Sequence, residues 1–243
     1  MQLLPPYTHP KTISSALAQQ GFAILPAADV AALSGSTGSA LEALRPSWNQ
    51  LAIDTYLKDG GKYRKRRHAS YVIDGITGVI TQAPHRPHWQ PVEYNALHGG
   101  MQRWFEPVEA STQTPAWNGL LLWTAELAYQ LRGKQTWFAE AHQFRIDTEG
   151  GIGRPTPEGA HRDGVDLVAV FLVAREGVKG GETRVFDADG PNGVRFTLTE
   201  PWSVLLLDDA KVVHETTPIQ PTSVNAFRDT LVITLRAGGF QSA

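Results

Sequence analysis

The stretch PEGAHRDG, residues 157–164, leads almost directly into the run DLVAVFLV, residues 166–173. A continuous apolar run of this length, bounded by glycine-rich sequence, predicts a strand that is buried on both faces. Short strands separated by turn signals are expected after it, at residues 183–186, 194–198, 203–207, 211–214 and 230–236. This spacing favours a β-sandwich or barrel, because the helix-strand alternation of a βαβ fold is missing.

The first half of the chain carries the helical patterns. Apolar residues recur at helical intervals over residues 116–132, with Gly133 just past the end, which predicts a helix packed across the outside of a sheet. Asp29 is expected to cap another helix, which the glycine- and serine-rich residues 34–39 interrupt. The remaining expectations are a helix over residues 12–20 and strands over residues 21–26 and 137–146.

Length and composition limit the possible functions. The 243 residues fit a single domain, with an arm and helices in residues 1–50 and a β core over about 55–243. A net charge of -2 predicts neither a nucleic-acid nor a membrane partner, so a small-molecule substrate is expected. The protein is expected to be a monomer or homodimer. Without cysteine, any metal must bind nitrogen and oxygen ligands. No secretion signal or long apolar run is visible, so a cytoplasmic location is expected.

Three residues have the types and order of a reactive metal site. His161 and Asp163 are two residues apart just before the buried strand, and His214 lies at the end of a later strand. Two imidazoles and one carboxylate can bind one face of a six-coordinate metal and leave the opposite face for other ligands. The sequence therefore predicts an open metal site at these three residues.

An anion site is expected next to the metal. Arg228 and Thr230 are two residues apart at the start of the last strand, so their side chains point the same way. A guanidinium beside a hydroxyl is suited to binding a carboxylate. Thr234 and Arg236 share the same face and are alternatives to Thr230.

Two further segments are rich in polar residues. The basic run YRKRRH, residues 63–68, is interpreted either as a solvated strand or loop or as the source of an arginine that binds an anion in a pocket. Residues 85–107 have few core-forming residues and predict a structured loop wall. His85 and His88 could bind a second metal, although Pro87 disfavours a helical arrangement of the pair.

Several of these motifs resemble the iron(II)- and 2-oxoglutarate-dependent dioxygenases, specifically the bacterial group that contains the L-isoleucine hydroxylases. A branch of that group associated with biofilm and stress phenotypes is similar too. The resemblance rests on residues 157–164, Arg175, residues 180–183, Asp208, residues 213–214 and residues 227–229, and on earlier segments at residues 63–67, 94–95, 99–100, 105–107 and 142–145. It implies a double-stranded β-helix, a cupin-like jelly-roll barrel with flanking helices.

The resemblance also implies cofactors and roles. Iron(II) would bind His161, Asp163 and His214, and Arg228 would bind the far carboxylate of 2-oxoglutarate, with dioxygen as co-substrate. The implied substrate is a free L-amino acid or derivative, for which Arg145, Glu158 and Arg66 are the candidate binding residues. Two alternatives are a zinc or manganese hydrolase or isomerase on the same barrel, and a non-catalytic regulatory protein that binds metal and 2-oxoglutarate and is linked to stress or biofilm behaviour.

Overall fold

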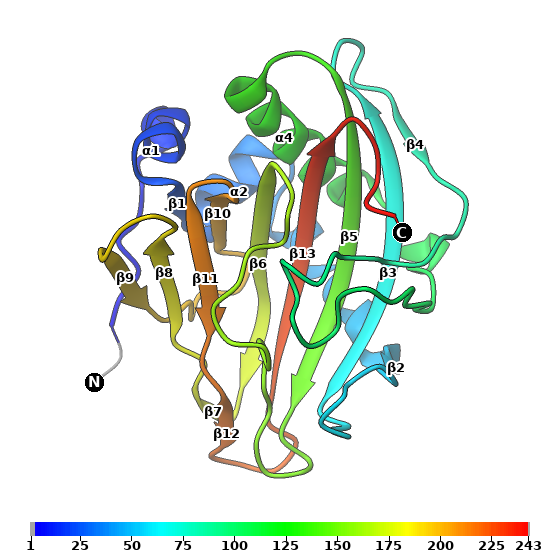
Figure 1. The fold of residues 1–243 in the computed structure, drawn as a ribbon, viewed down its shortest axis with the longest axis vertical. Coiled ribbons are helices and arrows are strands. Elements are labelled where there is room, and N and C mark those ends of the chain that lie inside the picture. The colour runs from blue at the N-terminus through cyan, green and yellow to red at the C-terminus, as the bar shows by residue number, and fades with distance from the viewer. Residues whose placement is uncertain (1–2, 243) are drawn as a thin grey trace.

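A large antiparallel sheet organises the molecule, seen in a computed structural model that describes residues 3–242 (Figure 1). Its eight strands follow the order β1-β10-β6-β13-β5-β3-β2, and β4 pairs with β3. The bounds are β1 Phe22–Leu25, β2 Ala52–Ile53, β3 Arg64–Asp74, β4 Ile80–Gln82, β5 Thr136–Asp147, β6 Leu167–Glu176, β10 Val204–Asp208 and β13 Phe227–Ala237. The predicted strands over residues 21–26, 137–146, 166–173, 203–207 and 230–236 are thus confirmed with small shifts at their ends.

Two small sheets complete the β structure of the described residues. One has the order β11-β8-β9 and the other pairs β12 with β7. Their bounds are β7 Val178–Gly180, β8 Thr183–Asp187, β9 Gly193–Phe196, β11 Val212–Thr216 and β12 Ile219–Pro221. Apolar side chains of the larger of the two sheets, such as Val185 and Val212, pack in one buried cluster with Val168 and Leu205 of the large sheet. Burial of this apolar surface holds the β11-β8-β9 sheet face to face with the large sheet.

Helices cover the opposite face of the large sheet (Figure 1). The longest, α4 (Pro115–Arg132), is capped by the Thr114 side chain, which accepts a hydrogen bond from the Trp117 backbone N–H, and it ends before Gly133 as predicted. The others are η1 Pro10–Thr12, α1 Ile13–Gln20, α2 Ala27–Leu33, α3 Gly38–Glu42, η2 Arg45–Gln50 and η3 Ala110–Thr112. None of the helices in residues 3–242 is both long and apolar enough to span a membrane.

The N-terminal helices follow the predicted pattern with one correction. Helix α1 stops where Gly21 takes a left-handed conformation, with φ of 79°. Helix α2 begins at Ala27 after Pro26, so Asp29 lies inside its first turn and the prediction of Asp29 as a cap is wrong. The predicted break is confirmed: α3 begins after Thr37, whose side chain accepts from the Ala40 N–H. Of the arm expected within residues 1–50, Met1 and Gln2 lie outside the described residues.

One face of strand β5 belongs to the apolar core, and the other face lines a polar cavity. Trp137, Ala139 and Ala141 are fully buried in the core under the helices. The alternate residues, among them Glu140 and His142, line a cavity on the other face. The neighbouring strands bring further residues to this face in rows: Arg66, Phe144 and Thr230 form one row, and His68, His142 and Val232 the next.

The segment between β4 and η3 forms a wall over this cavity, as predicted for residues 85–107. His88 and Arg103 exchange two backbone hydrogen bonds of 2.9 Å each, which fold the segment back on itself. The His68 N–H donates to the Glu106 carbonyl, which ties the end of the segment to β3. Polar side chains from this wall, including Gln90 and Arg103, therefore face the large sheet across the cavity.

Candidate active site

Backbone pairing brings together two of the three predicted metal ligands. His161 and His214 form an isolated antiparallel bridge, in which each N–H donates to the other's carbonyl at 3.1 and 2.9 Å. Directly opposed residues on neighbouring strands have adjacent side chains, and the two imidazole centroids are 4.6 Å apart. The Asp163 carboxylate lies 4.0 Å from His161 Nε2 and 3.9 Å from His214 Nε2. One donor atom from each residue lies within 4.8 Å of the other two.

The loop that carries Asp163 is fixed by other side chains. The buried carboxylate of Asp209 accepts the backbone N–H groups of Asp163, Gly164 and Val165 at 2.7 to 3.1 Å. From the other side, the Gln241 side chain donates to the carbonyls of Asp163 and Gly164. These contacts set the position of the Asp163 carboxylate before any metal binds.

The ionisation of the three residues is compatible with metal binding. Burial lowers the pKa of His214 far below its usual value, and the neighbouring His161 adds to the effect, so this imidazole is neutral at pH 7. Burial also disfavours the charged form of His161, but the negative charges of Asp163 and Glu158 outweigh it and raise that pKa. Burial raises the pKa of Asp163. A divalent cation would favour the neutral form of His161 and the ionised form of Asp163, because it binds neutral imidazole and ionised carboxylate.

Arg228 and Thr230 both line the same cavity and are both 4% exposed. Arg228 has no carboxylate within 4.0 Å in residues 3–242, and its Nε has no hydrogen-bond partner there. Burial, together with the nearby Arg175, lowers the Arg228 pKa to about 10. Of the alternatives to Thr230, Thr234 also lines the cavity, whereas Arg236 donates to the Gly239 carbonyl.

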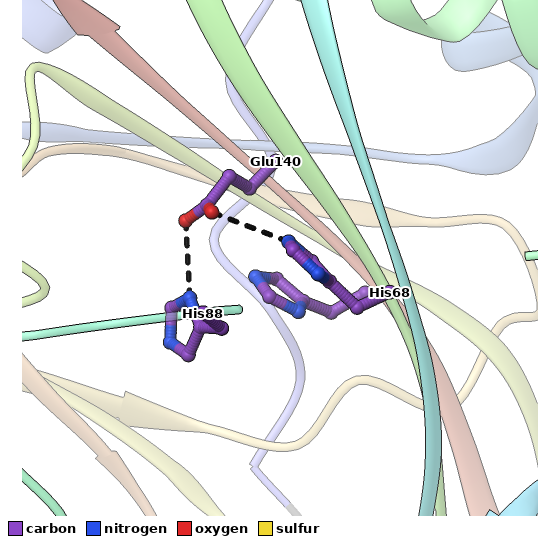
Figure 2. A group of neighbouring side chains, drawn as sticks. His68, His88 and Glu140 are labelled. Atoms are coloured by element: carbon purple, nitrogen blue, oxygen red, sulfur yellow. Dashed lines mark hydrogen bonds and ion pairs between the residues drawn. The ribbon is translucent and has the colours of Figure 1, made fainter. Parts of the chain in front are cut away.

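A second group of donors is formed by His68, His88, Glu140 and His142. Figure 2 shows the first three, with His68 and His88 on either side of the Glu140 carboxylate. Glu140 accepts from His88 Nδ1 at 3.0 Å and from Arg86 at 2.9 Å, and lies 3.2 Å from His68 Nε2. The His68 and His142 rings are stacked, with centroids 4.7 Å apart and an angle of 16° between their planes, so their in-plane lone pairs do not converge on one ion. Because Glu140 is also paired with the Arg86 guanidinium, we interpret this group as a polar network around Glu140. His85 is not in it and bonds to the Phe105 carbonyl instead.

Only some residues of the basic run and some candidate substrate residues line the cavity. Arg64 and Arg66 are buried and line the cavity, as the pocket interpretation of the run expects. Glu158 also lines the cavity, with Oε1 3.8 Å from His161 Nε2 and a buried Oε2 that has no partner in the described residues. Arg145 does not line it: its guanidinium makes two hydrogen bonds with Asp229, at 2.8 and 2.7 Å, and lies over the Phe227 ring. The prediction that Arg145 binds substrate is corrected, because its charge is neutralised elsewhere.

Comparisons with known proteins agree with this geometry. A family model described as 2OG-Fe dioxygenase matches residues 45–234. The chain belongs to this family. A crystal structure of a bsmA homolog from Methylobium petroleophilum PM1 is 53% identical, with a TM-score of 0.93 over 98% of this chain and 97% of that one. No curated protein sequence matches the chain.

More distant structures share the fold alone. IDO from Bacillus thuringiensis is 17% identical, with a TM-score of 0.76 over 96% of this chain and 100% of that one. The Fe(II)/(alpha)ketoglutarate-dependent dioxygenase TqaL is 20% identical, with a TM-score of 0.72 over 96% of this chain and 89% of that one. These likenesses identify the two facing sheets with flanking helices as the jelly-roll fold of the 2-oxoglutarate oxygenases.

Membership of the 2OG-Fe dioxygenase family establishes the general chemistry. The protein is an oxygenase of a family that uses iron(II) and 2-oxoglutarate, which argues against the alternative of a zinc or manganese hydrolase or isomerase. Several polar residues of the site had no individual signal in the sequence. Gln90, Arg103 and Gln241 line the cavity, and Asp209 supports the Asp163 loop. Each lies in a loop or turn, where no local pattern indicates its partners, so only the folded chain reveals them.

Proposed function

We propose that this oxygenase holds iron(II) through His161, Asp163 and His214, binds 2-oxoglutarate through Arg228 and Thr230, and hydroxylates a free L-amino acid or derivative. A cytoplasmic location is part of the same proposal. The observation that carries it is the buried Arg228 guanidinium, which lines the same cavity as the three donors and has no anionic partner among residues 3–242. An unpaired buried charge is costly, so this position favours an anionic ligand.

The residues present fit iron(II) and its co-substrate. Two imidazoles and one carboxylate are the donor set of an open ferrous site, and Arg228 with Thr230 offers charge-assisted hydrogen bonds to a carboxylate. When bound, iron(II) with dioxygen and 2-oxoglutarate supplies the oxidation of a C–H bond to an alcohol, while 2-oxoglutarate becomes succinate and carbon dioxide.

The protein's own residues would contribute position and exclusion of water. Asp209 and Gln241 keep the Asp163 loop in place, and Gln90 donates to Asp163 Oδ1 at 3.2 Å. Val170 and Val232 form an apolar part of the cavity lining on the large sheet. For a zwitterionic substrate, Glu158 has an unpaired acceptor atom for the ammonium group, and Arg66 offers positive charge on the opposite wall.

The test is succinate formation that requires iron(II), 2-oxoglutarate, dioxygen and a member of a free amino-acid panel, with a mass gain of one oxygen in the product. His161→Ala and Asp163→Ala should abolish turnover. Arg228→Ala should chiefly raise the KM for 2-oxoglutarate, by about 30-fold or more, because it removes one partner of a buried charge pair.

The variants must still fold, which thermal melting without ligand can verify. Turnover that survives in the Asp163→Ala variant would refute the proposed metal site. Stabilisation by Mn(II) and N-oxalylglycine without turnover of any compound would instead favour the regulatory alternative linked to stress or biofilm behaviour.

A further inference from the structure

Four arginines are buried in the described part of the chain, and all four line the active-site cavity. Arg64 and Arg66 share the buried carboxylate of Asp54, with nitrogen-oxygen distances of 2.7 and 3.8 Å. Arg103 and Arg228 have no carboxylate within 4.0 Å in residues 3–242. The cavity therefore contains two buried guanidiniums that form no direct ion pair, and the proposed function uses only Arg228.

Arg103 is the more deeply buried of the two, at 2% exposure. Its Nη2 donates to the Gln90 side-chain oxygen at 2.8 Å, whereas its Nε has no partner. Burial lowers the Arg103 pKa to about 10, but the guanidinium still carries its charge at pH 7. The pairing of its backbone with His88 fixes the residue in the wall over the cavity. A buried charge held so firmly, with donor atoms left free, is suited to a ligand carboxylate.

2-Oxoglutarate has no carboxylate left to pair with Arg103. Its keto acid end belongs at the metal, and its far carboxylate at Arg228, so none of its charge is left for a second guanidinium. We propose that Arg103 binds a carboxylate of the substrate and thereby selects acids over their neutral amides. This inference rests on the proposed function, because it needs Arg228 to hold the co-substrate.

Arg66, the candidate from the sequence, is less suited to this role. Its guanidinium lies between two aromatic rings, 3.7 Å from the Phe105 centroid and 4.3 Å from that of Phe144. One of its nitrogens is also 2.8 Å from His142 Nδ1. Both faces and one edge of Arg66 are thus already in contact with protein groups, and Asp54 partly balances its charge.

The position of Arg103 also connects it to the proposed metal site. The Gln90 side chain accepts from Arg103 and donates to Asp163 Oδ1, so Arg103 is two hydrogen bonds from a proposed metal ligand. A carboxylate bound by Arg103 would hold the rest of a small substrate in the part of the cavity next to His161 and Asp163. We expect Arg103 to determine which substrates bind.

The test measures binding by thermal melting of the intact protein loaded with Mn(II) and N-oxalylglycine. The probes are the twenty L-amino acids and, for each, the matching α-amide, which lacks the carboxylate charge. At least one acid should stabilise the wild type, and its amide should bind about 30-fold or more weakly. Arg103→Gln should weaken acid binding by a similar factor, with little change for the amide, and Arg103→Lys should restore part of the affinity. The exposed Arg195 on β9 provides the control, Arg195→Gln, which should behave as wild type.

Each outcome decides the inference. Three results would overturn the role of Arg103. The acid and its amide bind the wild type equally, Arg103→Gln binds the acid as tightly as the wild type does, or no acid binds although N-oxalylglycine stabilises the protein. If Arg103→Gln does not fold, the comparison of acid and amide on the wild type still decides. If N-oxalylglycine itself fails to stabilise the wild type, the proposed function is wrong, and the inference falls with it. Arg103→Gln should leave stabilisation by N-oxalylglycine intact, because Arg228 is unchanged.

Discussion

At the scale of single residues, Asp209 shows how a side chain that touches no ligand can control a site. Its carboxylate accepts three successive backbone N–H groups, from Asp163, Gly164 and Val165. Asp209→Asn replaces one acceptor oxygen by a donor, which would face an N–H group and loosen the loop. We expect the affinity for Mn(II) to fall about 10- to 100-fold, measured by calorimetric titration, because groups that orient metal ligands commonly contribute this much.

A matched substitution separates this effect from a general loss of acidic charge. Asp189, in the exposed turn between β8 and β9, is the control, and Asp189→Asn should bind Mn(II) as the wild type does. Unchanged Mn(II) affinity in a folded Asp209→Asn variant would show that the three hydrogen bonds do not position Asp163.

At the scale of elements, the packing of α4 on the large sheet gives a stability prediction. Trp117 is 1% exposed, and its Nε1 donates to the Tyr71 hydroxyl of β3 at 3.1 Å. Trp117→Ala leaves a cavity and removes this bond, so the free energy of unfolding should fall by about 3 to 5 kcal/mol. Urea denaturation measures the change. Leu122→Ala, at a 38% exposed position of the same helix, should cost about 1 kcal/mol or less. Similar losses for both variants would contradict this account of the packing.

The elements also show what the sequence could predict. Helix α4 follows from the helical spacing of its apolar residues, and strands β6, β10 and β13 follow from short apolar runs, so the local sequence is enough to predict them. Most of β3 could not be found this way, because its first half reads as a basic surface run. The charges of Arg64 and Arg66 are accommodated by Asp54 and by aromatic rings from other segments, which no local pattern reveals.

The same limit applies to the site at the scale of the whole molecule. The predicted residues His161, Asp163, His214 and Arg228 were found from their order along the chain and the family resemblance, and the fold brings them to one cavity. Arg145 was assigned from its residue type and the substrate that the family resemblance implies, and the face that it takes on β5 could not be read from the sequence. Arg103 was missed because the absence of a partner is a property of the folded protein. Residue type thus predicts a possible role, whereas burial and pairing determine whether the residue is free to perform it.

Buried histidines give the whole molecule a pH-dependent stability. Burial lowers the pKa of His88 to about 4 and also lowers the pKa values of His68 and His142. In the unfolded chain these imidazoles become protonated near pH 6.5. In the folded protein the same imidazoles become protonated only at lower pH. Stability is therefore lost as the pH falls from about 6.5 towards 4, and His88 alone contributes up to about 3 kcal/mol of this loss. Asp209 acts in the opposite direction, because burial and the nearby Asp163 raise its pKa to about 6.

A substitution isolates the histidine contribution from that of Asp209. His88→Gln keeps a polar side chain next to Glu140 but cannot titrate, so its free energy of unfolding should fall less steeply between pH 6.5 and 4 than that of the wild type. Urea denaturation at several pH values measures both slopes. If the free energy of unfolding of the wild type and of His88→Gln depended on pH in the same way, His88 would not resist protonation in the folded state. The polar network around Glu140 would then contain a charged imidazole.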